Sequence, residues 1–298
     1  MADQAQRLRR LADDLKANIA EKSAPRRIRP TRVIAITSGK GGVGKTNLAV
    51  NLGIALIQMG HDVLLLDADL GLANVDVILG TNPTHHLGHV IRGEKRMQDI
   101  IYRGPAGIKL VAGGSGLQEL LDLSEAELNR FIQGLQVLET QANYILLDTG
   151  AGLSRSVTSF VLAADEIVVV TNSEPTAMTD AYAAIKVITR QRPSATIRLI
   201  MNQVDDEDDA EVATNRLAMA ALRFLGVQVE SLGYIPDDPC VSRSVKKQQP
   251  FVLCYPTCSA SKSVKGLAKL LAGQAQEDAL GSGLFFDRLA RFFANLRA

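Results

Sequence analysis

Short apolar runs alternate with longer segments of mixed polarity along most of the chain. Each run has six to eight residues and is rich in Val, Ile and Leu; the runs span residues 32–37, 62–68, 108–113, 144–149, 166–171, 198–204 and 229–236. Runs that are apolar throughout, rather than at every second position, are typical of strands buried on both faces. The pattern therefore predicts a mainly parallel sheet.

The segments between these runs place apolar residues three and four positions apart, which is the period of a helix with one buried face. They predict helices over residues 45–59, 124–138, 177–190, 210–226 and 260–272. Strands that alternate with helices, without an internal repeat, indicate an α/β fold in which a mainly parallel twisted sheet carries helices on both faces. No boundary divides residues 31–275, so we expect a single domain there.

The two ends of the chain have a different pattern. Residues 1–22 predict one amphipathic helix, and residues 23–30, basic and flanked by prolines, have the composition of a linker. Residues 276–298 end in a second amphipathic helix, whose composition is typical of a helix lying in a membrane interface with arginines at anionic headgroups. The alternative is that this C-terminal helix packs on the domain. The apolar face of the helix comprises Leu284, Phe285, Phe286, Leu289, Phe292, Phe293 and Leu296.

Composition narrows the classes of function. The 298 residues are 46% hydrophobic and carry a net charge of +1, so no overall field attracts nucleic acid, and no sequence-specific binding to it is expected. Neither a signal peptide nor an apolar run of about 18 residues is present, which predicts a cytoplasmic protein or one peripheral to the membrane. Three cysteines, Cys240, Cys254 and Cys258, form no CxxC pair and are interpreted as ordinary thiols.

The segment after the first apolar run carries the strongest candidate chemistry. Residues 39–46 read GKGGVGKT, a full GxxxxGK[ST] loop between a predicted strand and a predicted helix. Glycines let backbone N–H groups converge on phosphate oxygens, and the helix N-terminus favours the anion. A glycine-rich turn without a ligand is the alternative. The predicted ATP-binding residues here are Gly41, Gly42, Val43, Gly44, Lys45, Thr46 and Asn47.

This loop also predicts a magnesium site. Lys45 is expected to hold the β and γ phosphates, and the Thr46 hydroxyl is expected to ligate Mg²⁺ directly. Asp148 follows the buried run YILL and is expected to orient the water ligands of the metal, as the acid of a Walker-B strand does.

The additional lysine in KGGVGKT, Lys40, is the signature of the deviant-Walker ATPases, and the chain resembles the MinD/ParA family of these P-loop proteins. The resemblance implies an ATP-bound homodimer in which Lys40 crosses to the phosphates of the partner subunit and acts in catalysis. A solvated loop lysine is the alternative interpretation. The segment LLLDADLGLANVD resembles the family's first switch, which implies that Asp69 positions the attacking water and that Asp67 acts near the metal through water. Solubilising acids at a strand end are the alternative.

The resemblance extends to the second switch and to base recognition. Residues 148–152 keep the form DxxAG, although Gly150 stands where proline or alanine is commoner. Asn202 matches the family's adenine-reading asparagine, and the segment Pro236, Asp237 and Asp238 matches its adenine-flanking loop. Glu174 corresponds to a position near the ribose at the dimer interface, and Asp180 to a partner-contacting position; both are alternatively helix-entry acids. The guanine-reading NKxD motif is absent, so the implied cofactors are ATP and Mg²⁺.

Within this family the chain resembles the flagellar FlhG/FleN group. The resemblance rests on the switch segments, on the terminal helix and on five residues near the N-terminus. These five are similar to the activator helix of FlhG proteins and are Asp3, Gln4, Ala5, Leu8 and Arg9. The resemblance implies that this helix stimulates FlhF, a signal-recognition-type GTPase, and that the ATPase regulates flagellar number or placement with basal-body or transcription-regulator proteins as further partners. It also implies docking on the inner membrane, with the C-terminal helix stowed in one nucleotide state and released in the other. A generic amphipathic tail is the alternative for residues 1–22.

Three other functions within the superfamily have discriminating features. A MinD-type cell-division ATPase would dispense with residues 1–22. A ParA-type DNA-partitioning ATPase predicts a basic body, whereas this chain is near neutral and carries the acidic run 205–209. An iron–sulfur carrier needs a CxxC pair, and the spacing from Cys254 to Cys258 is one residue too long.

Overall fold

The computed structural model describes residues 31–69, 74–114, 124–152, 154–274 and 285–295. The predicted N-terminal helix and linker therefore lie outside the described residues, and so do Asp3, Gln4, Ala5, Leu8 and Arg9, together with Leu284 and Leu296 of the C-terminal segment.

The described residues form one eight-stranded sheet, in the order β3-β4-β2-β5-β1-β6-β7-β8. All neighbouring strands are parallel except β3, which pairs antiparallel with β4 at one edge. Every residue of β2, β5 and β6 is buried, which explains why these strands are apolar except at one or two positions near their ends. The strands are β1 (Arg32–Thr37), β2 (Val63–Ala68), β3 (Ile101–Arg103), β4 (Lys109–Val111), β5 (Tyr144–Thr149), β6 (Glu166–Thr171), β7 (Thr196–Val204) and β8 (Glu230–Pro236).

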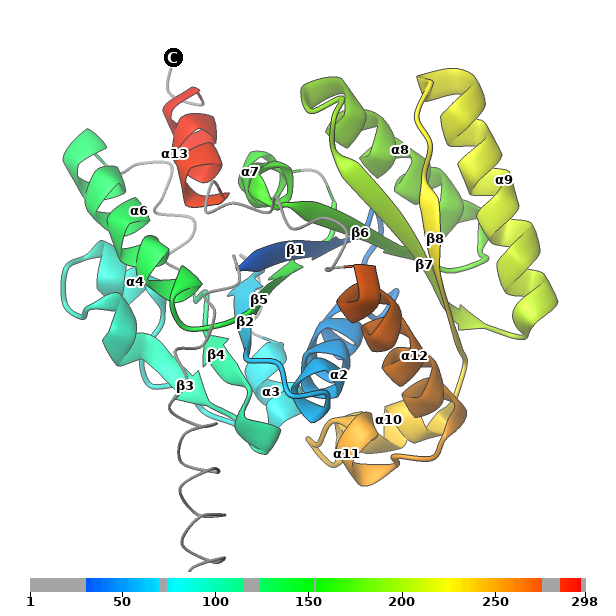
Figure 1. Ribbon diagram of the computed structural model, residues 1–298, viewed down its shortest axis with the longest axis horizontal. Coiled ribbons are helices and arrows are strands. Elements are labelled where there is room, and N and C mark those ends of the chain that lie inside the picture. Colours follow the sequence, from blue (N-terminus) through cyan, green and yellow to red (C-terminus); the bar gives the residue numbers. More distant parts are fainter. Residues whose placement is uncertain (1–30, 70–73, 115–123, 153, 275–284, 296–298) are drawn as a thin grey trace, which may run out of the picture.

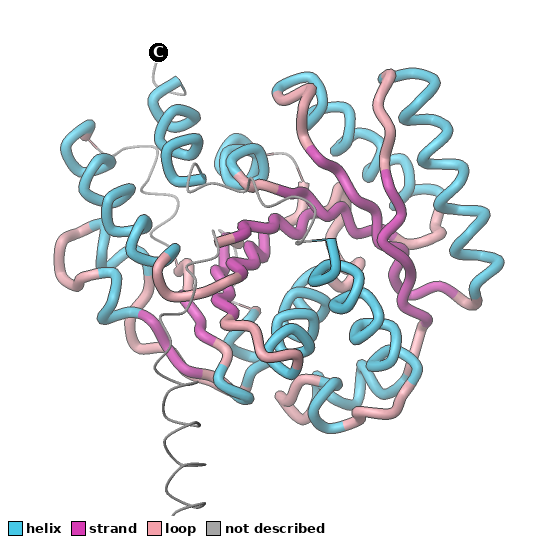
Figure 2. Tube along the Cα trace, viewed as in Figure 1, coloured by secondary structure: helices cyan, strands magenta, loops and turns pink. Residues whose placement is uncertain are grey.

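Helices cover both faces of this sheet, which confirms the predicted fold class (Figures 1 and 2). One apolar core lies beneath α4, α6, α7, α8, α9 and α13, and the other lies beneath α2, α3, α11 and α12. The helices are α2 (Lys45–Gln58), α3 (Val75–Leu79), α4 (Leu87–Ile91), α6 (Glu125–Glu139), α7 (Arg155–Ala163), α8 (Pro175–Gln191), α9 (Glu207–Leu225), α10 (Pro239–Lys246), α11 (Phe251–Cys254), α12 (Ser259–Gln274) and α13 (Phe285–Asn295), with the 3-10 turns η1 (Met97–Ile100) and η2 (Pro105–Gly107).

The C-terminal helix α13 packs against α6 and α7 (Figure 1). The side chains of Phe285, Phe286 and Leu289 are at most 1% exposed in this position. Arg288 donates from Nε to the carbonyl oxygen of Ala163 at 2.7 Å and forms an ion pair with Asp165. The structure therefore shows the alternative given by the sequence, in which the terminal helix packs on the domain. No helix within the described ranges is both long and apolar enough to cross a membrane.

Candidate functional site

The glycine-rich loop joins β1 to α2 at the carboxyl edge of the central strands. Gly42 and Gly44 have φ angles of 82° and 86°, a left-handed conformation that side chains with a Cβ rarely adopt. A Cβ on Gly39 would lie 2.1 Å from the carbonyl oxygen of Asp180 in α8. The loop can therefore pass this close to α8 only because position 39 is glycine.

Lys45 is the first residue of α2 and is 8% exposed. Its Nζ donates to Oγ of the fully buried Ser38 at 2.8 Å, and Ser38 in turn donates to the carbonyl oxygen of Lys40 at 2.6 Å. Burial lowers the pKa of the Lys45 ammonium, and the carboxylates of Asp148 and Asp69 partly oppose this effect. A phosphate bound in the loop would place a negative charge beside this buried ammonium and so stabilise its charged form.

Asp67 and Asp148 are the penultimate residues of the neighbouring strands β2 and β5 and are register partners in the sheet. Their side chains are 2% and 1% exposed. Burial, with the neighbouring carboxylate Asp148 as the next cause, raises the pKa of Asp67 to about 8. Burial also raises the pKa of Asp148 to about 7, although a hydrogen bond from Thr46 and the charge of Lys45 oppose it.

These acids fit a divalent cation. Oδ1 of Asp148 is buried and accepts no hydrogen bond within the part of the chain that the structure describes, and the same holds for Oδ1 of Asn47. Buried carboxylates of like charge disfavour each other unless a cation lies nearby. A hydroxyl from Thr46 and the carboxylates of Asp67 and Asp148 are oxygen donors of the kind that Mg²⁺ binds directly or through water.

Asp69 lies against the segment that follows β5. Its backbone N–H donates to Oδ1 of Asp67 at 3.0 Å. A Cβ placed on Gly150 would lie 2.9 Å from Oδ1 of Asp69, closer than real Cβ contacts. The glycine that departs from the family's second switch therefore leaves room for the Asp69 carboxylate.

Lys40 extends away from its own loop toward the start of α8. Its Nζ donates to Oε2 of Glu174 at 2.8 Å and to Oγ1 of Thr176 at 3.1 Å. The side chains of Lys40 and Glu174 are 39% and 59% exposed, so the pair lies at the surface. The structure thus brings together two predicted site residues that are 134 positions apart in the sequence.

The predicted base-binding residues come from the ends of β7 and β8. Asn202 is 8% exposed, and its Nδ2 donates to the carbonyl oxygen of Val43 at 2.8 Å. In this structure the amide therefore fixes the glycine-rich loop. Pro236 ends β8, Asp237 donates its N–H to the Val204 carbonyl at 2.9 Å, and Asp238 caps α10.

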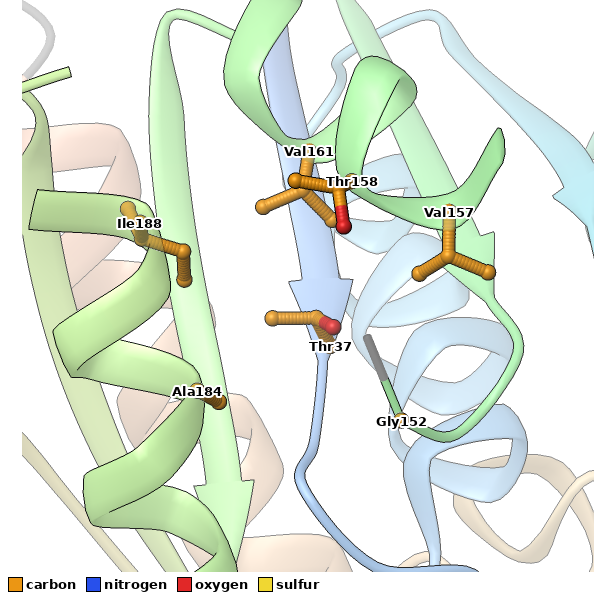
Figure 3. A pocket seen from close by; sticks show the side chains of 7 residues that line it. All are labelled: Thr37, Gly152, Val157, Thr158, Val161, Ala184 and Ile188. Carbon is orange, nitrogen blue, oxygen red and sulfur yellow. The ribbon is translucent and has the colours of Figure 1, made fainter. Parts of the chain in front are cut away.

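A small pocket borders the second switch at Gly152 (Figure 3). Thr37 at the end of β1, three residues of α7 and two of α8 complete its lining, which is mostly apolar. Its lining includes none of the predicted nucleotide-binding residues.

Sequence reasoning missed Ser38 and Thr176, which bind the two lysines of the loop. Ser38 could have been suspected, because it is the polar residue between the buried strand and the first glycine. Thr176 has no local signal, because only the tertiary fold brings it to Lys40.

A glycine-rich loop that opens a helix, with acids at the ends of neighbouring parallel strands, defines a P-loop nucleotide-binding protein. The family model "CobQ/CobB/MinD/ParA nucleotide binding domain" matches residues 34–251, and the chain belongs to this MinD/ParA family. It is an ATPase.

The similar proteins include flagellar regulators. The chain is 40% identical over 240 residues to the antiactivator FleN of Pseudomonas aeruginosa, covering 80% of this chain and 86% of FleN. It is 36% identical over 269 residues to the flagellum site-determining protein YlxH of Helicobacter pylori, covering 88% and 90%. The fold resembles that of the septum site-determining protein MinD of Pyrococcus horikoshii, complexed with Mg-ADP, with a TM-score of 0.68 and 27% identity over 82% of this chain and 97% of MinD.

The raised pKa of Asp67 predicts how its substitution changes stability with pH. The folded state holds a proton on this carboxyl up to about pH 8, whereas the unfolded chain loses it near the ordinary aspartate pKa of 3.8. Stability from this group is therefore lost as pH rises toward 8. Asp67→Asn should increase the free energy of unfolding relative to the parent protein, by a margin that grows by up to about 1.4 kcal/mol per pH unit between pH 5 and 8.

Urea denaturation of the protein freed of nucleotide and metal, at pH 5, 6, 7 and 8, measures this margin. Asp62→Asn, at the half-buried position just before the same strand, is the control. A margin for Asp67→Asn that stays constant with pH would contradict the assigned protonation.

Proposed function

We propose that this ATPase is a nucleotide-switched homodimer that regulates the number or placement of flagella. The observation that carries the proposal is Lys40, which lies at the surface on Glu174 and Thr176 instead of over its own glycine-rich loop. A lysine that leaves its own phosphate site is available to the phosphates of a facing subunit. The similarity to FleN and YlxH supports the flagellar role.

The proposed hydrolysis uses the charges at the carboxyl edge of the sheet. Lys45 binds the β and γ phosphates of ATP, and Thr46, Asp67 and Asp148 hold Mg²⁺ directly or through water. The metal ion neutralises charge on the phosphates. Asp69, which lies beside Gly150, positions the attacking water. Asn202 and residues 236–238 flank the base.

Dimerisation requires Lys40 to exchange its carboxylate partner for a phosphate. An exposed ion pair contributes only about 0–1 kcal/mol, so leaving Glu174 costs little. In the dimer Lys40 would offset the charge that develops on the transferred phosphoryl group. Glu174, then freed, lies at the same face for contact with the partner's nucleotide.

Substitutions at Asp69 and Lys40 should therefore have opposite effects on the oligomeric state. With ATP and Mg²⁺, Asp69→Ala should lose hydrolysis by about two orders of magnitude and accumulate as a dimer, because binding is kept and the water is not positioned. Lys40→Ala should lose both hydrolysis and the dimer. Light scattering coupled to gel filtration and a phosphate-release assay measure these outcomes.

The exposed acid Asp208 provides the control, because Asp208→Ala removes a carboxylate outside the site. Turnover by Asp69→Ala at the parental rate would remove Asp69 from the proposed role.

We further propose that α13 is the stowed form of a membrane-targeting helix, which makes the protein peripheral to the cytoplasmic face of the inner membrane. Phe285, Phe286 and Leu289 are buried against the domain here, and Arg288 ties the helix to Asp165. Release would expose these apolar side chains for insertion at an anionic lipid surface. Because these side chains are buried in the stowed form, they do not expose an apolar patch through which the protein would aggregate.

Weakening the attachment of α13 should increase binding to lipid in the absence of ATP. Arg288→Ala removes the ion pair with Asp165 and the hydrogen bond to Ala163, so we expect several-fold more co-sedimentation with phosphatidylglycerol vesicles. Arg291→Ala is the matched control, because Arg291 is exposed on the same helix and carries the same charge. Equal vesicle binding by the two variants would exclude Arg288 as the tie that stows α13.

The flagellar assignment also proposes that residues 1–22 stimulate the GTPase FlhF. These residues lie outside the described part of the chain, so the proposal rests on Asp3, Gln4, Ala5, Leu8 and Arg9. Basal-body or transcription-regulator proteins are the further proposed partners. A MinD-type role in cell division is the alternative that the structural similarity to MinD favours.

A synthetic peptide of residues 1–22 should accelerate GTP hydrolysis by the FlhF protein of the same organism at least several-fold. A peptide in which Leu8 and Arg9 are both alanine should not, because it lacks the apolar and basic contacts of the proposed activator helix. Released phosphate measures both. An unstimulated rate with the native peptide would favour the MinD-type function.

A further inference from the structure

Two cysteines and an aspartate gather where α10 and α12 begin. One ligand atom from each of Asp238, Cys240 and Cys258 lies within 4.8 Å of the others. Cys240 is the second residue of α10, and Cys258 immediately precedes α12. Among the described residues, this is the one group of three or more His, Cys, Asp or Glu side chains whose ligand atoms lie this close together.

The backbone holds these three side chains in place. Oδ1 of Asp238 accepts the N–H of Cys240 at 2.8 Å, and its Oδ2 accepts the N–H of Ala260 at 3.2 Å. The carboxylate thus joins the first turns of two helices. Sγ of Cys258 contacts Oγ of Ser261 at 3.3 Å, inside the first turn of α12. Because each ligand is fixed by its own helix start, binding a cation would require little ordering of the chain.

The ligand set selects a class of cation. Two thiolates and one carboxylate suit Zn²⁺, which binds Cys and Asp in tetrahedral sites, and they do not suit Mg²⁺, which takes oxygen ligands. Two sulfurs on one tetrahedral zinc are about 3.8 Å apart, given Zn–S bonds of about 2.3 Å. The observed separations therefore need to shrink by about 1 Å at most. All three residues are half-buried, which leaves the solvent side open for water as a fourth ligand.

We propose that Asp238, Cys240 and Cys258 form a binding site for Zn²⁺, separate from the magnesium and phosphate site. The cation would join the start of α12 to the loop after β8, where Pro236 and Asp237 are proposed to flank the base. Because α12 also packs against α2, which begins at the glycine-rich loop, the zinc site would be linked through α12 to the helix that follows the nucleotide loop.

A disulfide between Cys240 and Cys258 is the competing use of this pair. A disulfide would use the two sulfurs alone. The carboxylate of Asp238, with an oxygen within 4.8 Å of both sulfurs, adds the third ligand that a cation needs. This third ligand favours the metal over the disulfide.

Cobalt titration of the full chain tests the proposal directly. The protein, reduced and stripped of metal, is titrated with Co²⁺ and then with Zn²⁺. We expect one Co²⁺ per chain, with thiolate-to-cobalt charge-transfer absorption and tetrahedral ligand-field bands, displaced by one equivalent of Zn²⁺. Cys240→Ser and Cys258→Ser should each weaken Zn²⁺ binding at least tenfold.

Cys254→Ser is the matched control, because Cys254 lies on α11 outside the set and should leave the spectrum unchanged. Alkylation of the unmutated protein tests the site independently of whether the variants fold. Zn²⁺ should protect Cys240 and Cys258, but not Cys254, from N-ethylmaleimide, as read by mass spectrometry of peptides. Absence of thiolate absorption, equal protection of all three cysteines, or loss of binding in Cys254→Ser would each overturn the site.

Discussion

The register between β2 and β5 is the constraint on which the site depends. It places Asp67 directly beside Asp148 at the carboxyl edge of a sheet whose central strands are fully buried. Lys45, also buried, is the cation whose charge acts on Asp148. Burial away from water raises the free energy of these charged groups when no ligand is present. The raised pKa values of both acids reflect this effect. A magnesium ion and phosphates, with their opposite charges, would balance it.

Much of this fold could be predicted because parallel strands carry a strong local signal. The apolar runs at 32–37, 144–149 and 166–171 became β1, β5 and β6 with the same boundaries, since burial on both faces favours apolar residues along most of each strand. The antiparallel edge strand β3 was missed, because its three residues, two of them half-buried, show no period. The helices α3, α4, α7, α10 and α11, each of nine residues or fewer, were also missed, because so few turns give little periodic signal.

The site divides along a similar line. Thr46 and Lys45 could be assigned from spacing, because the loop and its helix are continuous in sequence. The contacts of Lys40 with Glu174 and of Asp69 with Gly150 could not, because each joins segments that only the sheet order brings together. The structure also adds a contact that the base-binding prediction did not include. Asn202 donates to the glycine-rich loop itself, so the same amide links the phosphate and base ends of the site.

The two proposed movements differ greatly in what must replace the contacts that they break. Lys40 leaves an exposed ion pair worth at most about 1 kcal/mol, and a phosphate easily offsets that loss. Helix α13 would withdraw Phe285, Phe286 and Leu289 from full burial, at about 1.5–3 kcal/mol for each side chain. Water cannot offset this loss, whereas lipid can. In the proposed cycle, nucleotide alone is therefore enough to drive dimer formation, while release of α13 requires a lipid surface to receive it.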